Sequence, residues 1–327
     1  MKVSIPSIAG LSLVAGVFLA GSVHAVVIDY VPVGNPGNPD DVTGNGAVGY
    51  GYQIGEYEVT NAQYAEFLNA VAQTDTYGLF NPSMSDNSSG GITRSGVSGS
   101  YSYAVKANMG NKPVNFVSWY DAARFTNWLH NSQPVGLQTL STTEGGAYTL
   151  SGNSGLISKE SSATVWIPTE NEWYKAAYYD PTAAETGNYW LYPTQSDSVP
   201  TVGLADLDGD ISNPGANVAN YSFGADWNGL DGHVTSVGST GSDSHYGTFD
   251  QAGNVWEWND AIIGSNRGMR GGSSTDGDFT LDSYARLVLS PSDEFANVGF
   301  RIATVPEPGV TVLVALASVL LRRRRRG

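Results

Sequence analysis

The sequence predicts an α+β domain with few helices, short strands and long loops. Three segments combine a helix N-cap with apolar residues at helical spacing, and all three precede Asp180. Long stretches rich in Ser, Gly and Asn separate these segments. After Pro181 no further regular helix is expected, and short strands joined by Gly, Asp and Asn turns continue to Thr304.

The first strand and helix are expected at the start of the domain. Gly55 to Val59 alternates as a strand does, and Thr60 begins a helix that runs to about Ala72. Gln63, three residues after Thr60, completes a capping box. The apolar face of this helix consists of Tyr64, Phe67, Leu68 and Val71.

A long polar loop and a second helix follow. Residues 81–104 form a surface loop, and a hairpin is expected at Tyr101 to Val105. Residues 112–117 are predicted as a strand. Ser118 then caps a helix from Trp119 to His130, with Asp121 at the third position. The residues predicted to be buried on this helix are Ala122, Phe125 and Leu129.

The third helix begins after another polar stretch. Residues 138–164 are rich in Ser, Gly and Thr, and Gly146 to Leu150 has the pattern of a hairpin arm. Thr169 and Glu172 form the clearest capping box in the chain, and the helix continues to about Tyr179.

Both ends of the chain are predicted to be sorting segments. Residues 1–25 have a positive start, an apolar stretch and a small-residue cleavage site, which is the pattern of a signal peptide. Residues 26–49 are a loose lead-in, in which Val26 to Val33 adds an edge strand. The domain itself spans residues 50–304. Residues 305–327 contain Pro-Glu-Pro, twelve mostly apolar residues and five arginines.

The tail is expected to be a transient retention signal rather than a permanent membrane anchor. Twelve helical residues span about 18 Å, against ~30 Å for the hydrocarbon core of a bilayer. The arginine block stays on the cytoplasmic side. The tail resembles the PEP-CTERM tail of Gram-negative surface proteins. This resemblance implies transient membrane contact, processing by an exosortase-type enzyme, and a final location in the cell envelope, at the surface or in the extracellular matrix.

Charge and cysteine content limit the possible partners. Without both sorting segments the chain has 10 basic and 30 acidic residues, a net charge of about −20. Nucleic acid is therefore not expected as a partner, because phosphate binding needs basic clusters. Divalent cations are favoured. The chain contains no cysteine, so an exported domain must be held by its core and hydrogen bonds, with bound metal as a further means.

The stretch from Tyr246 to Asp260 is the most informative single segment. It carries two carboxylates, Asp250 and Glu257, around a Gly-Asn turn and two tryptophans. Carboxylates and turned-out carbonyls in a short loop suit a hard cation such as Ca²⁺, which takes six to eight oxygen ligands. A plain turn that enters a strand, with the tryptophans in the core, explains the same residues.

Six motifs occur in order between Tyr52 and Ala303. They are Tyr57-Glu58-Val59-Thr60, Pro113-Val114-Asn115-Phe116-Val117-Ser118-Trp119, Ile167-Pro168-Thr169-Glu170, Gly253-Asn254-Val255-Trp256-Glu257-Trp258, Arg270-Gly271-Gly272-Ser273 and Gly299-Phe300-Arg301. Together they resemble the formylglycine-generating enzyme family, also called sulfatase-modifying factors. The resemblance implies a compact, irregular α+β fold related to C-type lectins.

The resemblance also implies two structural calcium sites. The first would use the side chains of Asp250 and Glu257 with the carbonyls of Gly253 and Val255. The second would use Asn220 and Asp231 with the carbonyls of Tyr221 and His233. All are oxygen donors, as Ca²⁺ requires. The alternative for the second set is that Asn220 and Asp231 cap turns.

One departure from the family concerns catalysis. The family's enzymes oxidise a substrate cysteine with copper held by two cysteines shortly after the Arg-Gly-Gly-Ser motif. Asp276 and Leu281 stand at those positions. Copper is not expected here, because Cu(I) selects soft thiolates and oxygen ligands do not replace them. Asp276, Asp278 and Asp282 form either a solvated acidic loop or a new metal or hydrolytic centre.

Other catalytic motifs are missing from the sequence. The three histidines outside the signal peptide are His130, His233 and His245, and none pairs at the i, i+4 spacing of a helical zinc site. His130 closes a helix, where a cation favours the macrodipole. The family's iron-dependent relatives use a separate His-rich helical domain, which is not expected here.

The sequence therefore predicts an exported, non-catalytic binding or surface-structural protein with structural calcium. Its ligand would be a glycan or another extracellular protein. The loops at residues 81–104, 138–164 and 276–282 are expected to form the recognition surface. Five aromatic residues either stack on sugars or belong to the core: Tyr178, Tyr179, Tyr189, Trp190 and Tyr192. The alternative function is an oxidoreductase of the same family with altered chemistry.

Overall fold

The computed structural model describes residues 25–150, 156–183 and 188–306. The predicted signal peptide, up to residue 24, and the predicted sorting tail, from residue 307, lie outside these ranges. In the described part of the chain no helix has both the length and the apolar character needed to cross a membrane.

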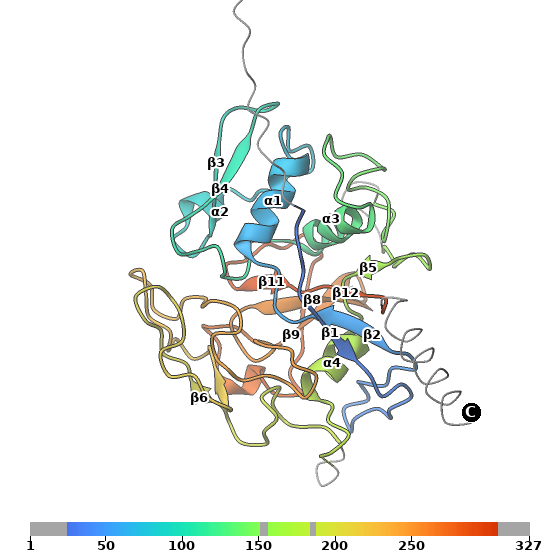
Figure 1. Cartoon of the computed structure of the whole chain (residues 1–327), viewed down its shortest axis with the longest axis vertical. Helices are drawn as coiled ribbons and strands as arrows, with labels where there is room; N and C mark the ends of the chain where they lie inside the picture. The colour runs from blue at the N-terminus through green and yellow to red at the C-terminus, as the bar shows by residue number, and fades with distance from the viewer. Residues whose placement is uncertain (1–24, 151–155, 184–187, 307–327) are drawn as a thin grey trace, which may run out of the picture.

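The described residues form the mixed α+β fold that the sequence predicts. Four α-helices are present: α1 (Asn61–Val71), α2 (Ser83–Asp86), α3 (Trp119–His130) and α4 (Glu170–Tyr178). In Figure 1, α1 and α3 lie together above the sheets, whereas α4 lies below them. Beyond α4 the described helical structure is a single 3-10 turn, η2 (Asp278–Thr280). The expectation that regular helix ends near Asp180 is confirmed.

Two four-stranded sheets form the centre of the molecule (Figure 1). The first has the order β1 (Tyr30–Val33), β2 (Tyr52–Gly55), β12 (Ala303–Thr304) and β5 (Val165–Trp166), and all its pairs are antiparallel. It joins the two ends of the domain, and β1 is the edge strand expected in the lead-in. The second sheet has the order β10 (Leu287–Leu289), β9 (Asn266–Arg270), β8 (Trp256–Ile263) and β11 (Val298–Phe300). In it β11 runs parallel to β8.

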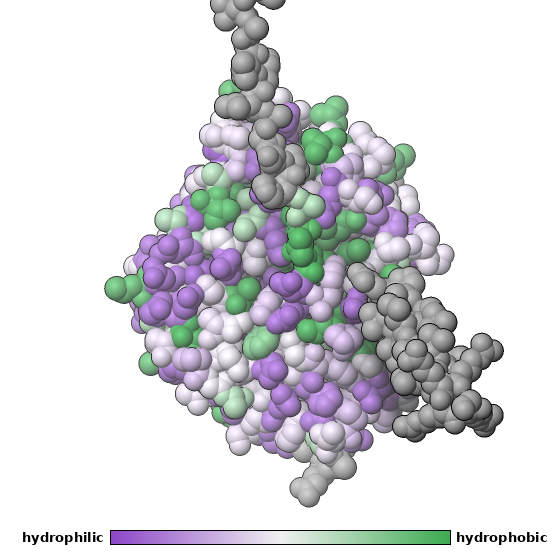
Figure 2. All heavy atoms as spheres, in the orientation of Figure 1, coloured by the Kyte–Doolittle hydropathy of each residue, from purple (hydrophilic) through white to green (hydrophobic). Residues whose placement is uncertain are grey.

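Two small sheets complete the strands. β3 (Ile92–Ser95) and β4 (Ser102–Val105) form an antiparallel hairpin, which confirms the hairpin expected near Tyr101. β6 (Thr201–Val202) and β7 (Val218–Ala219) form a short parallel pair within the long irregular region. On the face shown in Figure 2, hydrophilic side chains gather over the loops around β6.

The helix starts are confirmed because local capping chemistry specifies them. Thr60 accepts a hydrogen bond from the Gln63 amide at 3.3 Å, and the Gln63 side chain accepts one from the Thr60 amide at 2.9 Å. Reciprocal capping boxes of the same kind begin α3 at Ser118 and α4 at Thr169. Each box satisfies two amide groups that would otherwise have no partner at the helix start.

Two predicted strands are wrong. The strand expected at Gly55 to Val59 lies earlier, as β2. Residues 112–117 form no strand, because Pro113 makes only an isolated bridge to Thr60 and Phe116 adopts a positive φ of 56°. A non-glycine residue in that conformation ends an extended ladder. The hairpin arm expected near Gly146 is also reduced to one bridge, between Tyr148 and Lys159.

The core joins the helical layer to the second sheet through aromatic contacts. Phe125 of α3 lies between Phe67 of α1 and Phe300 of β11, with ring centroids 5.3 and 5.5 Å apart. Both contacts are edge-to-face, the arrangement that aromatic rings prefer. The apolar face predicted for α1 is fully buried in this core, as are Ala122 and Phe125 of α3, whereas Leu129 is half-buried.

Candidate functional site

A buried ion pair lies beneath the loop that leads into β8. Glu257 of β8 accepts hydrogen bonds from Arg301 Nε and Nη2, each at 2.6 Å, and from the Trp173 indole at 2.7 Å. Neither Glu257 nor Arg301 is exposed to solvent. Arg301 Nη1 also donates to the Gly55 carbonyl at 3.0 Å. Both carboxylate oxygens of Glu257 thus accept hydrogen bonds from protein donors.

Asp250 adds a second carboxylate to this buried region. Its backbone has a positive φ of 60°, which turns the chain ahead of β8. Its side chain accepts from the Gly238 amide and, at 3.4 Å, from the Thr240 hydroxyl. Burial raises the pKa of Asp250 to about 6, while the Gly238 hydrogen bond and the charge of Arg301 act in the opposite direction.

Glu58 is the third carboxyl group of the cluster. Its side chain is buried, with 1% of the residue exposed. Oε1 accepts from the Asn254 side chain at 3.2 Å, whereas Oε2 has no hydrogen-bond partner among the described residues. Burial raises the pKa of Glu58 well above its ordinary value, and the charges of Asp250 and Glu257 add to the shift. Three carboxyl groups therefore share one guanidinium.

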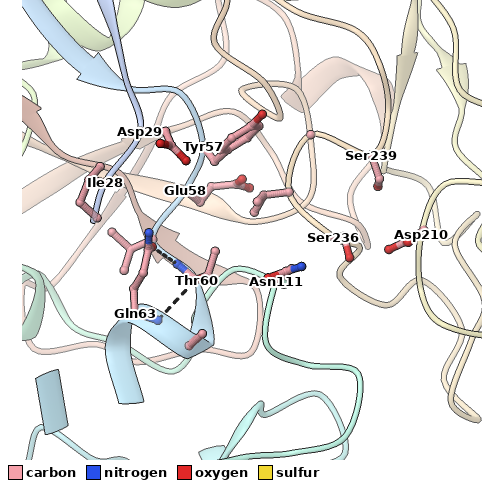
Figure 3. Close-up of a pocket in the computed structure, with 14 residues that line it drawn as sticks. Ile28, Asp29, Tyr57, Glu58, Thr60, Gln63, Asn111, Asp210, Ser236 and Ser239 are labelled. Atoms are coloured by element: carbon pink, nitrogen blue, oxygen red, sulfur yellow. Dashed lines mark hydrogen bonds between the residues drawn. The ribbon is translucent and has the colours of Figure 1, made fainter. Parts of the chain in front are cut away.

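A pocket of about 590 Å³ opens beside Glu58. Figure 3 shows the Glu58 side chain between Tyr57 and the start of α1, directed toward the loop that carries Ser236 and Ser239. The acidic residues of the lining are Asp29, Glu58 and Asp210, and the lining contains no Lys or Arg. The pocket is therefore acidic, and its size falls in the ordinary range for small-molecule sites.

The Gly-Asn turn of the first predicted calcium site packs on residues of the second. Gly253 has a φ of 87°, and a Cβ there would lie 2.0 Å from the Asn220 carbonyl oxygen. The Asn254 amide donates to the same carbonyl at 2.8 Å. Glycine is therefore required for close backbone approach as well as for its positive φ. The carbonyl-bearing residues Gly253 and Val255 are both buried here.

The second predicted site is only partly assembled. The Asn220 side chain is buried, donates to the His233 carbonyl at 2.9 Å, and leaves Oδ1 without a hydrogen-bond partner in the described chain. Tyr221 follows it and is also buried. Asp231 is exposed. The structure thus brings Asn220 and the His233 carbonyl together and leaves the carboxylate of Asp231 in solvent.

The His233 ring has a structural environment. It stacks on Trp227, with centroids 4.6 Å apart, and Nδ1 accepts from the Val234 amide at 2.8 Å. Burial lowers the pKa of His233 to about 4, so the ring is neutral at physiological pH. Over the ranges that the structure describes, no group of three or more His, Asp and Glu side chains lies close enough to hold a metal ion.

The two positions that carry thiols in the resembling enzymes have structural roles here. Asp276 accepts from the Trp256 indole at 2.8 Å and from the Ser273 hydroxyl. Leu281 is fully buried and packs in a cluster with Tyr192, Ala219, Tyr221 and Ala252. A carboxylate engaged by two donors and a buried leucine do not fit copper, which binds soft thiolates.

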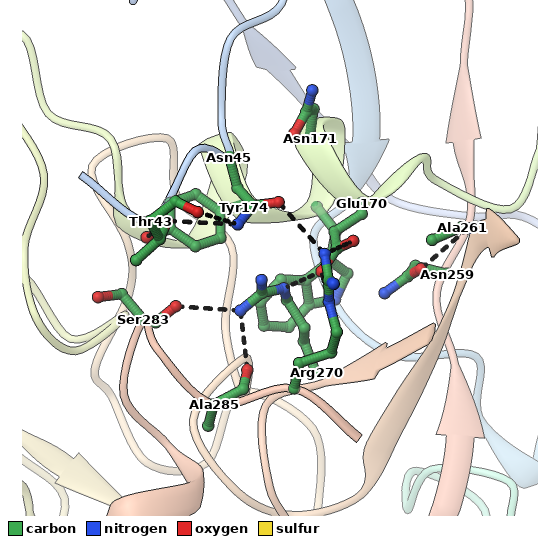
Figure 4. A network of polar contacts seen from close by, with 12 residues as sticks. Thr43, Asn45, Glu170, Asn171, Tyr174, Asn259, Ala261, Arg270, Ser283 and Ala285 are labelled. Carbon is green, nitrogen blue, oxygen red and sulfur yellow. Dashed lines mark hydrogen bonds and ion pairs between the residues drawn. The ribbon is translucent and has the colours of Figure 1, made fainter. Parts of the chain in front are cut away.

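A charged network holds the loop that contains these positions (Figure 4). Arg270 donates to Glu170 at 2.7 Å and, through Nη1, to the carbonyls of Ser283 and Ala285 at 3.0 and 2.8 Å. Arg286 also donates to Glu170, at 2.6 Å through Nε. The network therefore anchors the far end of the loop to the start of α4.

Large aromatic side chains on and beside the anchored loop are exposed. Phe279 is 72% exposed, Tyr284 66% and Phe223 55%. Phe223 lies beside the loop, because its amide donates to the Ser274 carbonyl at 2.9 Å. In contrast, the aromatics considered for sugar stacking are not available: Tyr178, Tyr179, Tyr189 and Tyr192 are buried, and Trp190 is half-buried. For the four tyrosines the core alternative is confirmed, whereas Trp190 keeps part of its surface in solvent.

The loops predicted to form one recognition surface do not lie together. In Figure 1 the hairpin of β3 and β4 lies beside α1 and the loop after α3 lies nearby, whereas η2 lies at the opposite end near β6. Sequence reasoning also missed Arg301 and the pocket at Glu58. The available signal was a single arginine within the otherwise apolar stretch Phe300 to Ala303.

This chain is similar to known proteins both in sequence and in structure. The family of sulfatase-modifying factor enzyme 1-like domains matches residues 30–305. Hercynine oxygenase of Mycolicibacterium smegmatis is 26% identical over 220 residues, which are 63% of this chain and 36% of that protein. The chain thus spans about a third of the length of this relative.

Solved structures resemble the fold. The crystal structure of CarF matches with a TM-score of 0.52 and 23% identity, covering 86% of this chain and 99% of that chain. PvdO from Pseudomonas aeruginosa matches with a TM-score of 0.45 and 18% identity, covering 85% and 92%. At these identities the likeness to CarF concerns the fold alone.

Proposed function

Because the chain belongs to the family of sulfatase-modifying factor enzyme 1-like domains, we propose that it is a non-catalytic member that serves as a binding or surface-structural module. The observation that carries this proposal is the replacement of the thiol pair. The chain has no cysteine, and Asp276 and Leu281 have structural roles at the corresponding positions. Copper-dependent oxidation of a substrate cysteine has no ligand set here.

The proposed binding surface is the loop from Asp276 to Tyr284. Phe279 and Tyr284 expose large aromatic surface, and aromatic residues contribute much of the binding energy at interfaces. The loop is anchored through Arg270 and Arg286 to Glu170. A rigid support of this kind reduces the ordering cost of binding. The expected ligand is a glycan or a protein outside the cell.

Structural calcium is part of the proposal. Asp250, Glu257 and the carbonyls of Gly253 and Val255 would hold one ion. Glu58, Asp250 and Glu257 lie near the single guanidinium of Arg301, and this excess of two acidic groups supports a cation in the region. At the second site, Asn220 and the carbonyls of Tyr221 and His233 would contribute. Asn220 Oδ1 has no hydrogen-bond partner among the described residues and is a suitable oxygen ligand. Asp231 would have to move inward from solvent.

Export to the cell surface is also proposed, on sequence grounds. The first 25 residues have the composition of a signal peptide, and the tail from residue 305 resembles sorting tails processed by exosortase-type enzymes. Processing would leave a strongly acidic domain free of the membrane.

The alternative function is an enzyme of altered chemistry, supported by the likeness to a relative named as an oxygenase. Metal analysis of the purified full chain separates the two functions. Calcium as the sole metal supports the module. Copper or iron at one ion per chain would overturn it in favour of the enzyme. A glycan and peptide binding screen, compared between the native chain and Phe279→Ala, then tests the proposed surface: a ligand that binds both equally contradicts the assignment.

A further inference from the structure

The pocket beside Glu58 contains an incomplete polar site. Glu58 Oε2 is buried without a hydrogen-bond partner in the described chain, although its other oxygen is held by Asn254. An unpaired buried carboxyl oxygen is unfavourable, because it has lost water without gaining a donor. Figure 3 shows this side chain directed toward the loop across the pocket. The oxygen itself is enclosed, so a donor bound in the pocket would reach it through a turn of the carboxyl group.

The electrostatic surroundings favour a cation as that donor. Besides Glu58, the lining contributes Asp29 at the exposed rim and Asp210 on the opposite side. Lys112 lies in an adjoining hollow, where it pairs with Asp210 at 3.5 Å and donates to Ser236 at 2.8 Å. The charge of Lys112 is therefore paired with Asp210. The pocket lining offers no Lys or Arg side chain to pair with Glu58 or Asp29.

The remaining lining suits a short alkyl chain that carries the charge. Ile28, Val59 and Val237 contribute apolar side chains to the wall. The Tyr57 ring is fixed by stacking on Phe249, with centroids 5.5 Å apart, and an aromatic face attracts an ammonium group. A metal ion fits this pocket less well, because Ca²⁺ needs six to eight oxygens. The carboxylates of the lining are Asp29, Glu58 and Asp210, and Asp210 is already paired with Lys112.

We infer that this pocket binds a ligand through a primary ammonium group, which donates to Glu58 Oε2 while its alkyl chain lies along Tyr57. The inference deepens the proposed binding function by naming a ligand class, and it concerns a site separate from the aromatic loop at Phe279. The ammonium group comes either from a small free amine or from a lysine side chain of a partner.

The test compares charged and neutral probes of one shape. Isothermal titration of the full chain with n-butylammonium and with n-butanol should give at least about tenfold tighter binding of the ammonium. Glu58→Gln should reduce ammonium binding by about tenfold or more. Glu66→Gln is the matched control, because Glu66 is an exposed carboxylate on α1 outside the pocket. It should bind as the native chain does.

A second variant tests the site without changing Glu58, in case Glu58→Gln disturbs folding. Ala62 lines the pocket at the start of α1 and is only half-buried, so Ala62→Phe should fill the cavity without altering its charges. Loss of ammonium binding in this variant, with an unchanged melting temperature, supports the site. Equal affinity for n-butanol, or full binding by Glu58→Gln, would overturn it.

The source of the ammonium group is separated with a third probe. Tighter binding of Nα-acetyl-lysine amide than of n-butylammonium supports a protein lysine, and the reverse supports a free amine. Binding of CaCl₂ that depends on Glu58, without ammonium binding, would overturn the inference in favour of a metal site. Because Phe279 plays no part, ligand capture at the aromatic loop can fail or succeed independently.

Discussion

Arg301 joins Glu257 in a bidentate ion pair that is fully withdrawn from solvent, with both contacts at 2.6 Å. Glu257 belongs to β8, and Arg301 follows directly after β11, the strand that pairs in parallel with β8. Trp173 of α4 donates to the same carboxylate. One ion pair thus connects the second sheet, the chain leading to β12, and the helix below the sheets.

Removing one member of this pair should be costly. Arg301→Met leaves Glu257 buried with the single indole donor, so we expect the free energy of unfolding to fall by about 3–5 kcal/mol. The measurement is urea denaturation followed by tryptophan fluorescence. The double variant Glu257→Gln with Arg301→Met should recover much of the loss, because no unpaired charge remains. A double variant as unstable as the single one would contradict the assignment.

Calcium should stabilise the domain if the acidic cluster holds an ion. We expect the melting temperature to rise with calcium and to fall with a chelator, because an ion that binds only the folded state stabilises it. Asp250→Ala should remove most of the effect, whereas Asp278→Ala, which alters a carboxylate outside the cluster, should not. An unchanged melting curve in chelator would mean that Arg301 alone balances the buried carboxylates.

The sequence predicted those features that depend on neighbouring residues. Thr60 with Gln63 and Thr169 with Glu172 specify helix starts within three residues, and both capping boxes occur as predicted. Strand positions failed where distant residues decide them. Phe116 is not extended, because its amide donates a hydrogen bond to the carbonyl of Phe295, which lies far along the chain.

The site was predictable only in part for the same reason. The Asp250 to Glu257 stretch could be singled out because its residues are close in sequence. Its partner Arg301 lies 44 residues beyond Glu257, and the sequence showed it only as part of the Gly299-Phe300-Arg301 motif. Glu58 alternates in sequence as an ordinary strand residue would, and nothing local indicates that its carboxyl group ends in a buried cluster beside a pocket.

A second pair of acidic residues predicts a pH dependence of stability. Asp121 at the start of α3 is fully buried near Glu294, and burial, followed by the charge of Glu294, raises the pKa of Asp121 to about 8. In the unfolded chain the same carboxyl titrates near 4. The folded state therefore retains a proton that the unfolded state has lost, and this contribution to stability falls as pH rises from about 4 to about 8.

Asp121→Asn should remove that slope. The amide keeps an acceptor for the Ser118 amide and hydroxyl, which bond Asp121 at 2.9 and 2.6 Å, but cannot ionise. Relative to this variant, the native chain should lose up to about 1.4 kcal/mol of stability per pH unit in that window. Urea unfolding at several pH values measures the difference. Parallel pH profiles for the two proteins would show that Asp121 ionises normally.

The last prediction compares a buried and an exposed residue of the loop from Asp276 to Tyr284. Leu281 is fully buried, so Leu281→Ala should cost about 2–5 kcal/mol of unfolding free energy through the cavity it leaves. Phe279, two residues earlier, is mostly exposed, so Phe279→Ala should change stability by no more than about 0.5 kcal/mol while weakening any ligand found in the binding screen. Urea unfolding and ligand titration on both variants measure these effects. A neutral Leu281→Ala would mean that this position is not core and would reopen the case for chemistry there, whereas a destabilised Phe279→Ala would show that the aromatic loop supports the fold instead of presenting a surface.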